Sequence, residues 1–405
     1  MNRGRRPVYL DQAATTFPKP RAVQQAVDQA VRRWGANPGH SGHTLAVETA
    51  RRVYQCREEA AALFGCQPEG IIFTKNCTEA INLAIWGTMR PGGHLIISDL
   101  EHNAVARVAQ ALEDRGIAQY DVARVYPEDD LRTVYSFASL LRPNTQLIAC
   151  THGSNVFGYR LPVEQIGALA HGRGIPMLVD AAQTAGLLPL DLSRMAVDYL
   201  CVPGHKGLYG PMGTGILAVG PRVRQDQLRP LMQGGTGAAS LELTMPQLLP
   251  DRLESGTLNT PGILGLREGI RFVRQKGIDN LYRREMELTG WTWQQLRQIP
   301  GVRLYGPPPQ LGRTLPVLSF TIGELDGSQT AAALDQLGIA VRGGFHCAGL
   351  AHRKMGTQRT GTARASFGAG NTREDAAALV TAVRQVARQQ QKNGGDFPPT
   401  NSFSG

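Results

Sequence analysis

The sequence predicts an α/β protein with a large domain built on a mostly parallel sheet between helices, plus a smaller α+β domain. Between about residues 20 and 260, short apolar runs alternate with helical patterns, which is typical of parallel strands connected by helices. The runs are apolar throughout instead of alternating with polar residues, as strands buried on both faces are. The chain of 405 residues also exceeds what one hydrophobic core usually supports.

The elements of the large domain follow from these patterns in order. Helices are expected over residues 44–63, 79–86 and 105–115. Strands are expected at the apolar runs GIIFT (70–74), HLIISD (94–99), QLIACTH (146–152), PMLVDAAQ (176–183) and YLCVPG (199–204). Asn76 is placed to cap the second of these helices, with Glu79 at the third helical position as in a capping box.

The small domain has a different pattern. After about residue 260 we expect strands at VRLYG and VLSFTI, a helix over 329–337, and strands at IAVRGG and RASFG. A last helix begins at an Asn371-x-x-Glu374 capping pattern and runs to about residue 388. The large domain is therefore placed at 18–260, the small one at 1–17 and 261–390, and the Gly-, Pro- and Ser-rich residues 391–405 are expected to form a disordered tail.

Composition and charge exclude several classes of protein. No apolar run approaches the roughly 20 residues that cross a membrane, and the basic start MNRGRRPVYLDQ lacks the apolar core of a secretory signal. The six cysteines are scattered without a C-x-x-C pair, so we expect no disulfide framework, no metal site and a reducing, cytoplasmic location. The net charge of +10 comes without the basic runs of a nucleic-acid site and is interpreted as a surface that favours anionic ligands.

Polar residues that follow the apolar runs are the candidate site. In open α/β sheets, ligands bind beyond the carboxyl ends of the strands. The residues at these positions are Thr78, His102, Asn155, Asp180, His205 and Lys206.

Lys206 and Asp180 together point to pyridoxal 5′-phosphate (PLP). Asp180 ends an apolar strand, where a carboxylate costs free energy unless it meets a cation or donors. PLP chemistry needs a lysine for the Schiff base and an acidic partner for the pyridinium nitrogen. The helix start after Asn76, with the hydroxyl of Thr78, offers a phosphate site. Each residue alone also fits an ordinary capped helix or solvated turn.

The set resembles the cysteine desulfurases, and more closely their group II branch, which includes the selenocysteine lyases. The resemblance runs from YLDQAATTFPKP to RASFGAGNT, through the landmarks TEAINLA, EHNAV, GSNVFG, DAAQTAG, GHKGLYGPMGTGIL, ESGTLNTPGILGL, VRGGFHCAG and ARASFG. It implies a fold-type-I PLP-dependent transferase of the class V aminotransferase group. It also implies a homodimer that converts L-cysteine to L-alanine, holds the sulfur as a persulfide and delivers it to an acceptor protein.

The resemblance implies roles around the cofactor ring. Lys206 is the Schiff-base lysine and Asp180 the partner of the pyridinium nitrogen. Gln183 donates to the phenolic oxygen of the ring, and His102 stacks on its face and moves protons.

Further roles concern the phosphate. Cys77, Thr78 and His205 are implied to form part of the phosphate cup, and Thr257 to reach the phosphate of the neighbouring subunit. The chain departs from the family pattern at Pro203, where a hydroxyl residue is usual, and at Cys77, where glycine or threonine is usual.

The remaining roles concern the substrate. Asn155 and Arg364 are implied to hold its carboxylate, and Cys347 is implied to be the nucleophile. Arg364 comes 17 positions after Cys347, and this short spacing is similar to the loop of group II. Because an unperturbed thiol is only a few per cent thiolate at pH 7, a neighbour should lower its pKa; the candidates are His346, Arg342 and His102.

Other functions stay open at this point. The chain could be a selenocysteine lyase acting on L-selenocysteine, another class V PLP enzyme such as an aminotransferase in which Cys347 is incidental, or a sulfur-carrier scaffold without catalysis. The use of the sulfur, with iron–sulfur cluster assembly as one possibility, is open as well.

Overall fold

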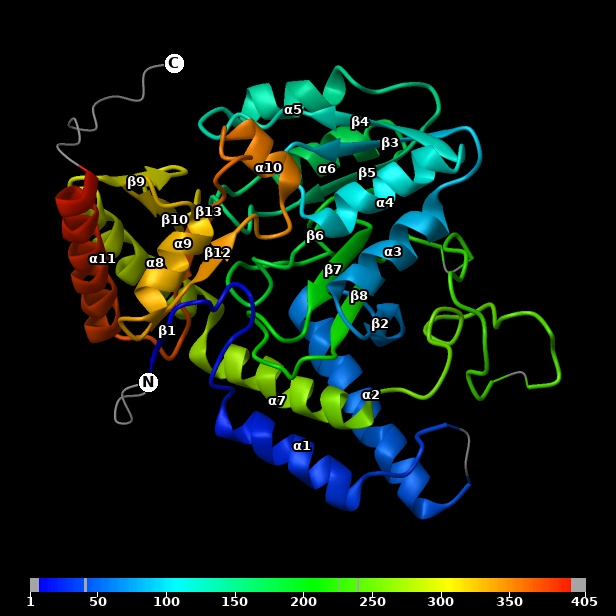
Figure 1. The fold of residues 1–405 in the computed structure, drawn as a ribbon. Helices are drawn as coiled ribbons and strands as arrows, with labels where there is room; N and C mark the ends of the chain where they lie inside the picture. The colour runs from blue at the N-terminus through cyan, green and yellow to red at the C-terminus, as the bar shows by residue number, and fades with distance from the viewer. Residues whose placement is uncertain (1–6, 40–41, 225, 239, 395–405) are drawn as a thin grey trace. The chain divides into compact units, whose positions relative to one another are not determined.

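The computed structural model describes residues 7–39, 42–224, 226–238 and 240–394. They divide into two compact units, each described here by itself (Figure 1). The larger unit comprises 18–152 and 161–278, and the smaller unit comprises the described parts of 1–17, 153–160 and 279–405. The predicted tail lies outside the described residues from 395 on, and its first four residues belong to the last helix.

The larger unit is built on a seven-stranded sheet in the order β2-β8-β7-β6-β5-β3-β4. Its strands are β2 (Ile71–Thr74), β3 (Gly93–Ser98), β4 (Ala118–Ala123), β5 (Thr145–Thr151), β6 (Met177–Asp180), β7 (Tyr199–Pro203) and β8 (Gly215–Val219). The pairs from β4 through β7 are parallel, whereas β8 runs antiparallel to both of its neighbours. The predicted mostly parallel sheet is confirmed.

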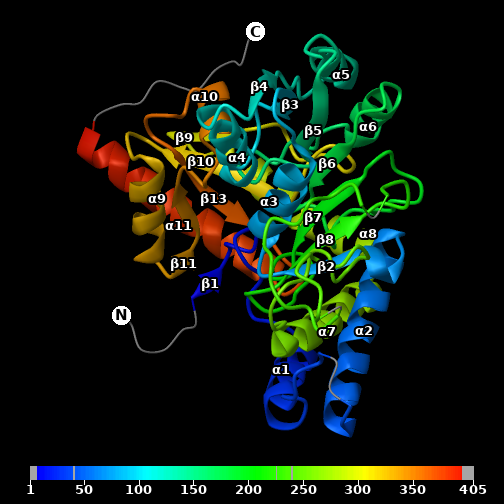
Figure 2. The ribbon, with the colours of Figure 1, turned by 90° about the vertical axis from the view of Figure 1, so that its right-hand side faces the viewer.

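Helices cover both faces of this sheet, as Figure 2 shows. One face carries α3 (Cys77–Thr88) and α4 (Asn103–Asp114), and the other carries α5 (Asp130–Ala138) and α6 (Val163–His171). The edge strand β4 was not expected, because its residues are partly exposed and do not form an apolar run. Among the described residues, no helix has the length and apolar character needed to span a membrane.

The boundary between the units lies later than the sequence placed it. Helix α7 (Thr260–Lys276) belongs to the larger unit, because it packs along α1 (Arg21–Arg33) and α2 (Thr44–Phe64) (Figures 1 and 2). Its buried residues include Leu266 and Ile270, so this packing removes a full apolar helix face from water.

The smaller unit contains a four-stranded antiparallel sheet in the order β12-β13-β10-β9. Its strands are β9 (Val302–Tyr305), β10 (Val317–Ile322), β12 (Arg342–Gly344) and β13 (Thr362–Ser366). The helices are α8 (Ile278–Leu296), α9 (Gly327–Asp335), α10 (Gly349–Lys354) and α11 (Arg373–Gly394). Near the chain start, β1 (Val8–Tyr9) pairs in parallel with β11 (Ile339–Ala340), which ties the N-terminal segment to this unit.

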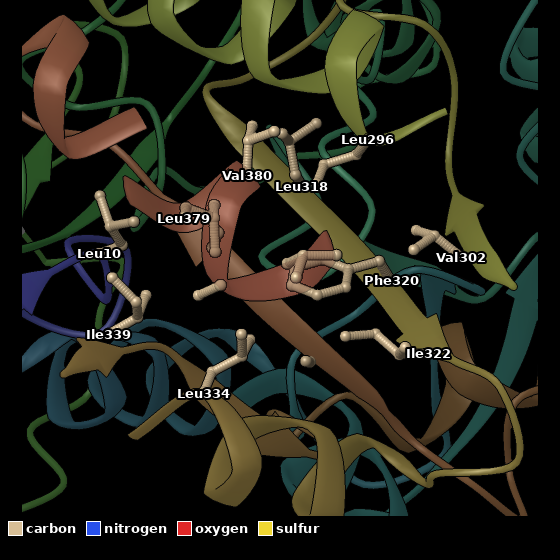
Figure 3. Close-up of a cluster of buried hydrophobic side chains, with 14 of the residues drawn as sticks. Leu10, Leu296, Val302, Leu318, Phe320, Ile322, Leu334, Ile339, Leu379 and Val380 are labelled. Atoms are coloured by element: carbon tan, nitrogen blue, oxygen red, sulfur yellow. The ribbon is translucent and has the colours of Figure 1, made fainter. Parts of the chain in front are cut away.

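The core of the smaller unit lies between its sheet and helices (Figure 3). Phe320 on β10 is fully buried and packs in one cluster with Leu296 of α8, Leu334 of α9 and Leu379 of α11. These side chains come from four elements, so the cluster holds the sheet and three helices together.

The last helix begins differently from the prediction. Asn371 does not cap it, because the Asn371 side chain instead accepts from Gly368 N at 2.9 Å and donates to Tyr9 O at 3.0 Å. The cap is formed by Thr372 and Asp375, since each side chain accepts a hydrogen bond from the backbone N–H of the other, at 3.3 and 3.0 Å. The Asn371–Glu374 capping pattern was therefore wrong by one residue.

Replacing Phe320 by alanine should lower the free energy of unfolding of the smaller unit by about 3–5 kcal/mol, because it removes a fully buried ring and leaves a cavity. Urea unfolding followed by circular dichroism measures the loss. Leu311→Ala, at an exposed leucine of the same unit, is the control and should change stability by less than about 0.5 kcal/mol. Equal effects of the two substitutions would contradict the assigned core.

Candidate active site

Asp180 lies at the carboxyl end of β6 and is almost fully buried. Its Oδ1 accepts from the backbone N–H of Ala182 at 2.9 Å and faces Cys77 Sγ at 3.5 Å. Gln183 is half-buried in the loop that follows the strand. The sheet places Asp180 there because strand β6 is apolar up to this residue and pairs on both sides, with β5 and β7.

Lys206 lies in the turn after β7, packed against the loop that follows Asp180. A methyl group at Gly207 would lie 2.2 Å from the carbonyl oxygen of Ala185, and one at Gly186 would lie 2.1 Å from the carbonyl oxygen of Gly207. Both positions therefore require glycine, and Gly186 also has a φ of +83°. The two loops approach backbone to backbone, which fixes the base of Lys206 relative to Asp180.

His205 is held by a lysine that the sequence analysis did not single out. Lys19 Nζ donates to the carbonyl oxygen of His205 at 2.6 Å. Burial lowers the pKa of Lys19 to about 8. Burial, together with the charges of Lys206 and Lys19, lowers the pKa of His205 to about 4. His205 is therefore neutral at physiological pH and can meet an anion as a polar ring but not as a cation.

The start of α3 is organised as the sequence predicted, with one difference. The Asn76 side chain caps the helix by accepting from Glu79 N at 2.9 Å, whereas the Glu79 carboxylate accepts from Lys75 N instead of Asn76 N. Thr78 is exposed at the first turn. Cys77 is buried and its thiol faces Asp180; burial first, and then the charge of Asp180, raise the pKa of this thiol well above its usual value. The Cys77 thiol therefore stays protonated.

Thr257 is exposed on a segment that is anchored by a buried ion pair. Both oxygens of the Glu254 carboxylate accept from Arg57, at 2.8 and 2.9 Å, and one also accepts from Phe73 N at 2.5 Å. Residues of this segment line a cavity of about 190 Å³ together with the start of α3. Glu254 belongs to the ESGT landmark, but its partner lies 197 residues away, so no local pattern predicts this ion pair.

His102 caps α4, and this contact fixes which ring nitrogen can carry a proton. Its Nδ1 accepts from Ala104 N at 3.0 Å, so Nδ1 is unprotonated and the proton of the neutral ring is on Nε2. The preceding Glu101 is fully buried and accepts from the Ser98 hydroxyl and from Thr151 N. Burial raises the pKa of Glu101 to about 8, so this carboxyl is mostly protonated at neutral pH. Sequence analysis missed Glu101, which resembles an ordinary loop glutamate.

Cys347 is exposed on a strained turn of the smaller unit. His346 and Cys347 both have left-handed backbone conformations, with φ of +50° and +56°. Such conformations cost non-glycine residues about 1–2 kcal/mol each, so the surrounding contacts must hold the turn. Because the other five cysteines of the chain are buried or half-buried, Cys347 is the thiol that solvent reaches best.

His346 is not the cation that the sequence suggested for lowering the pKa of Cys347. Its ring is buried, its Nε2 lies 2.9 Å from the carbonyl oxygen of Thr362, and it stacks on His352 at a centroid distance of 5.9 Å. Burial, with the charge of Arg364, lowers the pKa of His346 to about 2. Arg342, another candidate for this role, lies on β12 of the same unit.

Arg364 and Asn155 are directly connected within the smaller unit. Arg364 is fully buried on β13, where its Nη1 donates to the carbonyl oxygen of Asn155 at 2.9 Å and its Nη2 to Asp11 Oδ1 at 2.6 Å. Burial lowers the pKa of Arg364, and the carboxylate of Asp11 opposes that change. The Asn155 side chain donates through Nδ2 to the carbonyl oxygen of His346 at 2.8 Å.

Two observations in the larger unit fit PLP. Asp180 is almost fully buried and accepts a backbone hydrogen bond through Oδ1, and a protonated ring nitrogen would give this carboxylate a further donor. The backbone N–H groups of Cys77 and Thr78 make no hydrogen bond in the part of the chain that the structure describes. Free N–H groups at a helix start favour a phosphate. No group of three or more potential metal ligands occurs among the described residues.

Comparison with known proteins gives the family. Residues 8–379 match the family described as Aminotransferase class-V. The chain belongs to this family. The chain is also similar to a cysteine desulfurase of Salmonella dublin. The two are 36% identical over 389 residues, which cover 94% of this chain and 93% of the relative. The predicted resemblance to the cysteine desulfurases is confirmed.

Solved structures agree with this assignment. The fold is similar to that of a cysteine desulfurase from Thermococcus onnurineus NA1, with a TM-score of 0.86, 29% identity and 95% of each chain covered. A cysteine desulfurase from Escherichia coli matches with a TM-score of 0.82, 28% identity and 95% of each chain covered. The predicted fold-type-I architecture of this class V family member is confirmed.

The structure thus places the predicted residues in two groups. The larger unit brings together Asp180, Cys77, Lys206 and His205, whose charges and contacts act on one another. The smaller unit holds the predicted substrate and sulfur residues: Asn155, Cys347 and Arg364.

Glu101→Gln should change how stability depends on pH. In the unfolded chain Glu101 ionises near pH 4.3, but in the folded chain its pKa is about 8. The Glu101 carboxyl therefore makes its full contribution to the free energy of unfolding below about pH 4, and this contribution is lost as the pH rises toward 8. The free energy of unfolding of Glu101→Gln minus that of the wild type should grow by up to about 1.4 kcal/mol per pH unit between about pH 5 and 8.

Urea unfolding at several pH values measures this difference. The control is Glu113→Gln, at an exposed glutamate on α4, where the difference should stay constant with pH. A constant difference for Glu101→Gln would show that its carboxyl ionises normally in the folded chain.

Proposed function

We propose that this chain is a PLP-dependent cysteine desulfurase that converts L-cysteine to L-alanine and receives the sulfur on Cys347 as a persulfide. The observation that carries the proposal is Cys347 itself, an exposed thiol on a strained turn, in a chain that belongs to the class-V aminotransferase family. A structural cysteine would be expected in the core, as the other cysteines of this chain largely are.

Residues of the larger unit are proposed to hold the cofactor. Lys206 is its covalent anchor, Asp180 receives the ring N–H and Gln183 meets the ring oxygen. The phosphate is held at the start of α3 by the backbone N–H groups of Cys77 and Thr78, with His205 as a neutral partner. When bound, PLP acts as an electron sink for the bonds at the Cα atom of an amino acid.

The phosphate site differs in two ways from the one expected from the family. Cys77 contributes its backbone N–H but not its thiol, because the thiol faces Asp180. Pro203 contributes neither a hydroxyl nor an N–H, since it is the last residue of β7 and has no backbone donor. The start of α3 therefore carries more of the phosphate binding in this chain.

Protons are moved by two groups of the larger unit. Lys206 would be the base that takes up the Cα proton of the substrate. His102 would be a proton carrier beside the cofactor, with its proton at Nε2, because Nδ1 is occupied by the helix cap. Asn155 and Arg364 are proposed to bind the substrate carboxylate; the guanidinium is suited to this because it presents several N–H donors in one plane.

The sulfur transfer balances without an external oxidant. The Cys347 thiolate attacks the sulfur of L-cysteine, a new S–S bond forms and the Cβ–S bond breaks. The electron pair of the broken bond stays with carbon, which takes up a proton, so that one L-cysteine and one enzyme thiol give one L-alanine and one enzyme persulfide. Exposure of Cys347 leaves the persulfide open to a sulfur-acceptor protein.

A homodimer is proposed from the segment between β8 and α7. Its described residues include large apolar side chains that this chain leaves in water: Leu231, Met232, Leu241, Leu243 and Leu248. Leu241 and Leu243 are completely exposed. A second copy that covers these side chains would also bring Thr257 of the partner subunit toward the phosphate, as the resemblance implies. The cytoplasm as the compartment stays a prediction from the sequence.

Brief exposure of the PLP-loaded wild type to L-cysteine should add one sulfur to Cys347, matched by an equal amount of L-alanine. Intact-mass and peptide mass spectrometry with alanine quantification measure both. Cys347→Ala should keep the absorbance of the lysine-bound cofactor but lose essentially all sulfur transfer, because the attacking thiolate is absent. Lys206→Ala should lose turnover and the reducible covalent link to the cofactor.

Either of two results would contradict this assignment. Full persulfide formation in Cys347→Ala would mean that another cysteine receives the sulfur. Conversion of L-cysteine or another amino acid to its keto acid, with no added sulfur, would favour the aminotransferase function instead.

Leu243→Asp should shift the protein from dimer to monomer and speed the loss of PLP at least tenfold, because it places a charge where an apolar contact is proposed. Light scattering and cofactor absorbance during dialysis measure the two effects. Leu131→Asp, at an exposed leucine on α5, is the matched control and should stay dimeric. A dimeric Leu243→Asp would exclude this segment from the interface.

A further inference from the structure

The turn that carries Cys347 needs contacts from outside itself. Within the turn, Ala348 N donates to Phe345 O at 2.9 Å, which closes the backbone but does not select left-handed conformations at both His346 and Cys347. Besides its stacking on His352, His346 has hydrogen-bond partners at two residues outside the turn. Its ring nitrogen meets the carbonyl oxygen and the hydroxyl of Thr362, and its own carbonyl oxygen accepts from Asn155.

Asn155 is the more distant of these partners, 191 residues away in sequence. It is buried, and its side-chain orientation is determined by chemistry, because only the NH₂ group of the amide can face a carbonyl oxygen. At 2.8 Å the contact is a short, well-formed hydrogen bond to the residue directly before the thiol.

The same residue touches Arg364 through its main chain. Arg364 Nη1 donates to the Asn155 carbonyl oxygen at 2.9 Å, while Nη2 pairs with Asp11 Oδ1 at 2.6 Å. Because Arg364 is fully buried and pairs with a carboxylate, its position is well determined. A continuous set of polar contacts therefore runs from Asp11 through Arg364 and Asn155 to the backbone of the Cys347 turn.

We propose that Asn155 is a positioning residue for the nucleophile: its side-chain amide holds the Cys347 turn in its left-handed conformation and keeps that turn in a fixed place relative to Arg364. This inference rests on the proposed desulfurase function and deepens it. It gives the side chain of Asn155 a task besides contact with the substrate, for which one of its two amide hydrogens is already used. Asp11 supports the arrangement by fixing the guanidinium.

The test compares Asn155→Asp, which keeps the size but replaces the donor by a carboxylate, with Asn155→Ala. The matched control is Ser319→Ala. Ser319 Oγ donates to the carbonyl oxygen of Val156 at 2.6 Å and accepts from the Thr362 hydroxyl at 3.4 Å. This substitution therefore removes buried hydrogen bonds, one of them to the same segment at the next residue, while the bond from Asn155 to His346 stays in place. All variants are prepared with PLP and checked for cofactor absorbance and thermal melting.

Two readouts distinguish positioning from substrate contact. In steady-state turnover of L-cysteine, Asn155→Asp and Asn155→Ala should lower kcat at least tenfold, in addition to any rise in KM from the lost carboxylate contact. Binding of L-alanine, seen as a change in cofactor absorbance, measures the loss of that contact separately. In hydrogen–deuterium exchange without substrate, peptides over 343–352 should exchange at least tenfold faster, since the amide of Ala348 loses its ordered turn. Ser319→Ala should change neither readout.

The inference is overturned if KM and the L-alanine dissociation constant rise tenfold while kcat and exchange of the turn are unchanged, which would make Asn155 a substrate contact alone. Equal exchange in Asn155→Asp and Ser319→Ala would also overturn it. Failure of the desulfurase function itself is recognised separately, as wild-type protein that forms neither alanine nor a persulfide. The exchange measurement remains decisive in that case, because it needs no turnover.

Discussion

Burial of carboxyl groups at the ends of the parallel strands is the constraint on which the larger unit depends. A carboxylate in an apolar interior costs several kcal/mol unless donors or cations compensate, and this chain buries Asp180 after β6 and Glu101 after β3. The burial of these two carboxyl groups is compensated in different ways. Glu101 keeps a proton near neutral pH, because burial raises its pKa to about 8. Asp180 accepts from the backbone N–H of Ala182 through Oδ1, and under the proposed function a protonated ring nitrogen would be a further donor to this carboxylate.

The smaller unit, in contrast, contains a buried positive charge. Arg364 is enclosed on β13, and its charge is retained because Asp11 lies 2.6 Å away. Asp11 follows β1, and β1 is held by β11 from the far end of the chain. The first residues of the chain are thus needed in this unit for an electrostatic reason as well as for strand pairing. A surface ion pair would contribute little, but removal of one partner of a buried pair leaves an uncompensated charge and costs about 3–5 kcal/mol.

Sequence patterns identified the residues whose local context is unusual and missed those whose context is ordinary. Asp180 was singled out because a charge at the end of an apolar run is conspicuous, and Lys206 because it follows another apolar run and, together with Asp180, matches what PLP chemistry needs. Glu101, Lys19 and Asp11 looked like common loop or terminal residues, and what makes them important is a partner distant in the chain: Asp11 and Arg364 are 353 residues apart. The same limitation explains the error at the last helix, where Asn371 was already engaged by Gly368 and Tyr9, and at His346, whose burial removes the charge that its position beside Cys347 suggested.

The turn of Cys347 joins two properties that usually exclude each other. An exposed thiol can be reached by a second protein, but exposed loops are ordinarily mobile and place a side chain poorly. Here the thiol is exposed while the residue before it is buried, and the strain at both residues persists because buried partners hold His346 from two sides. A thiol presented in this way needs no loop movement to be accessible, and its geometry is determined by the interior of the unit. Under the proposed function, contacts that hold the backbone beneath an exposed nucleophile, rather than mobility of a long loop, would let this chain combine reaction with delivery.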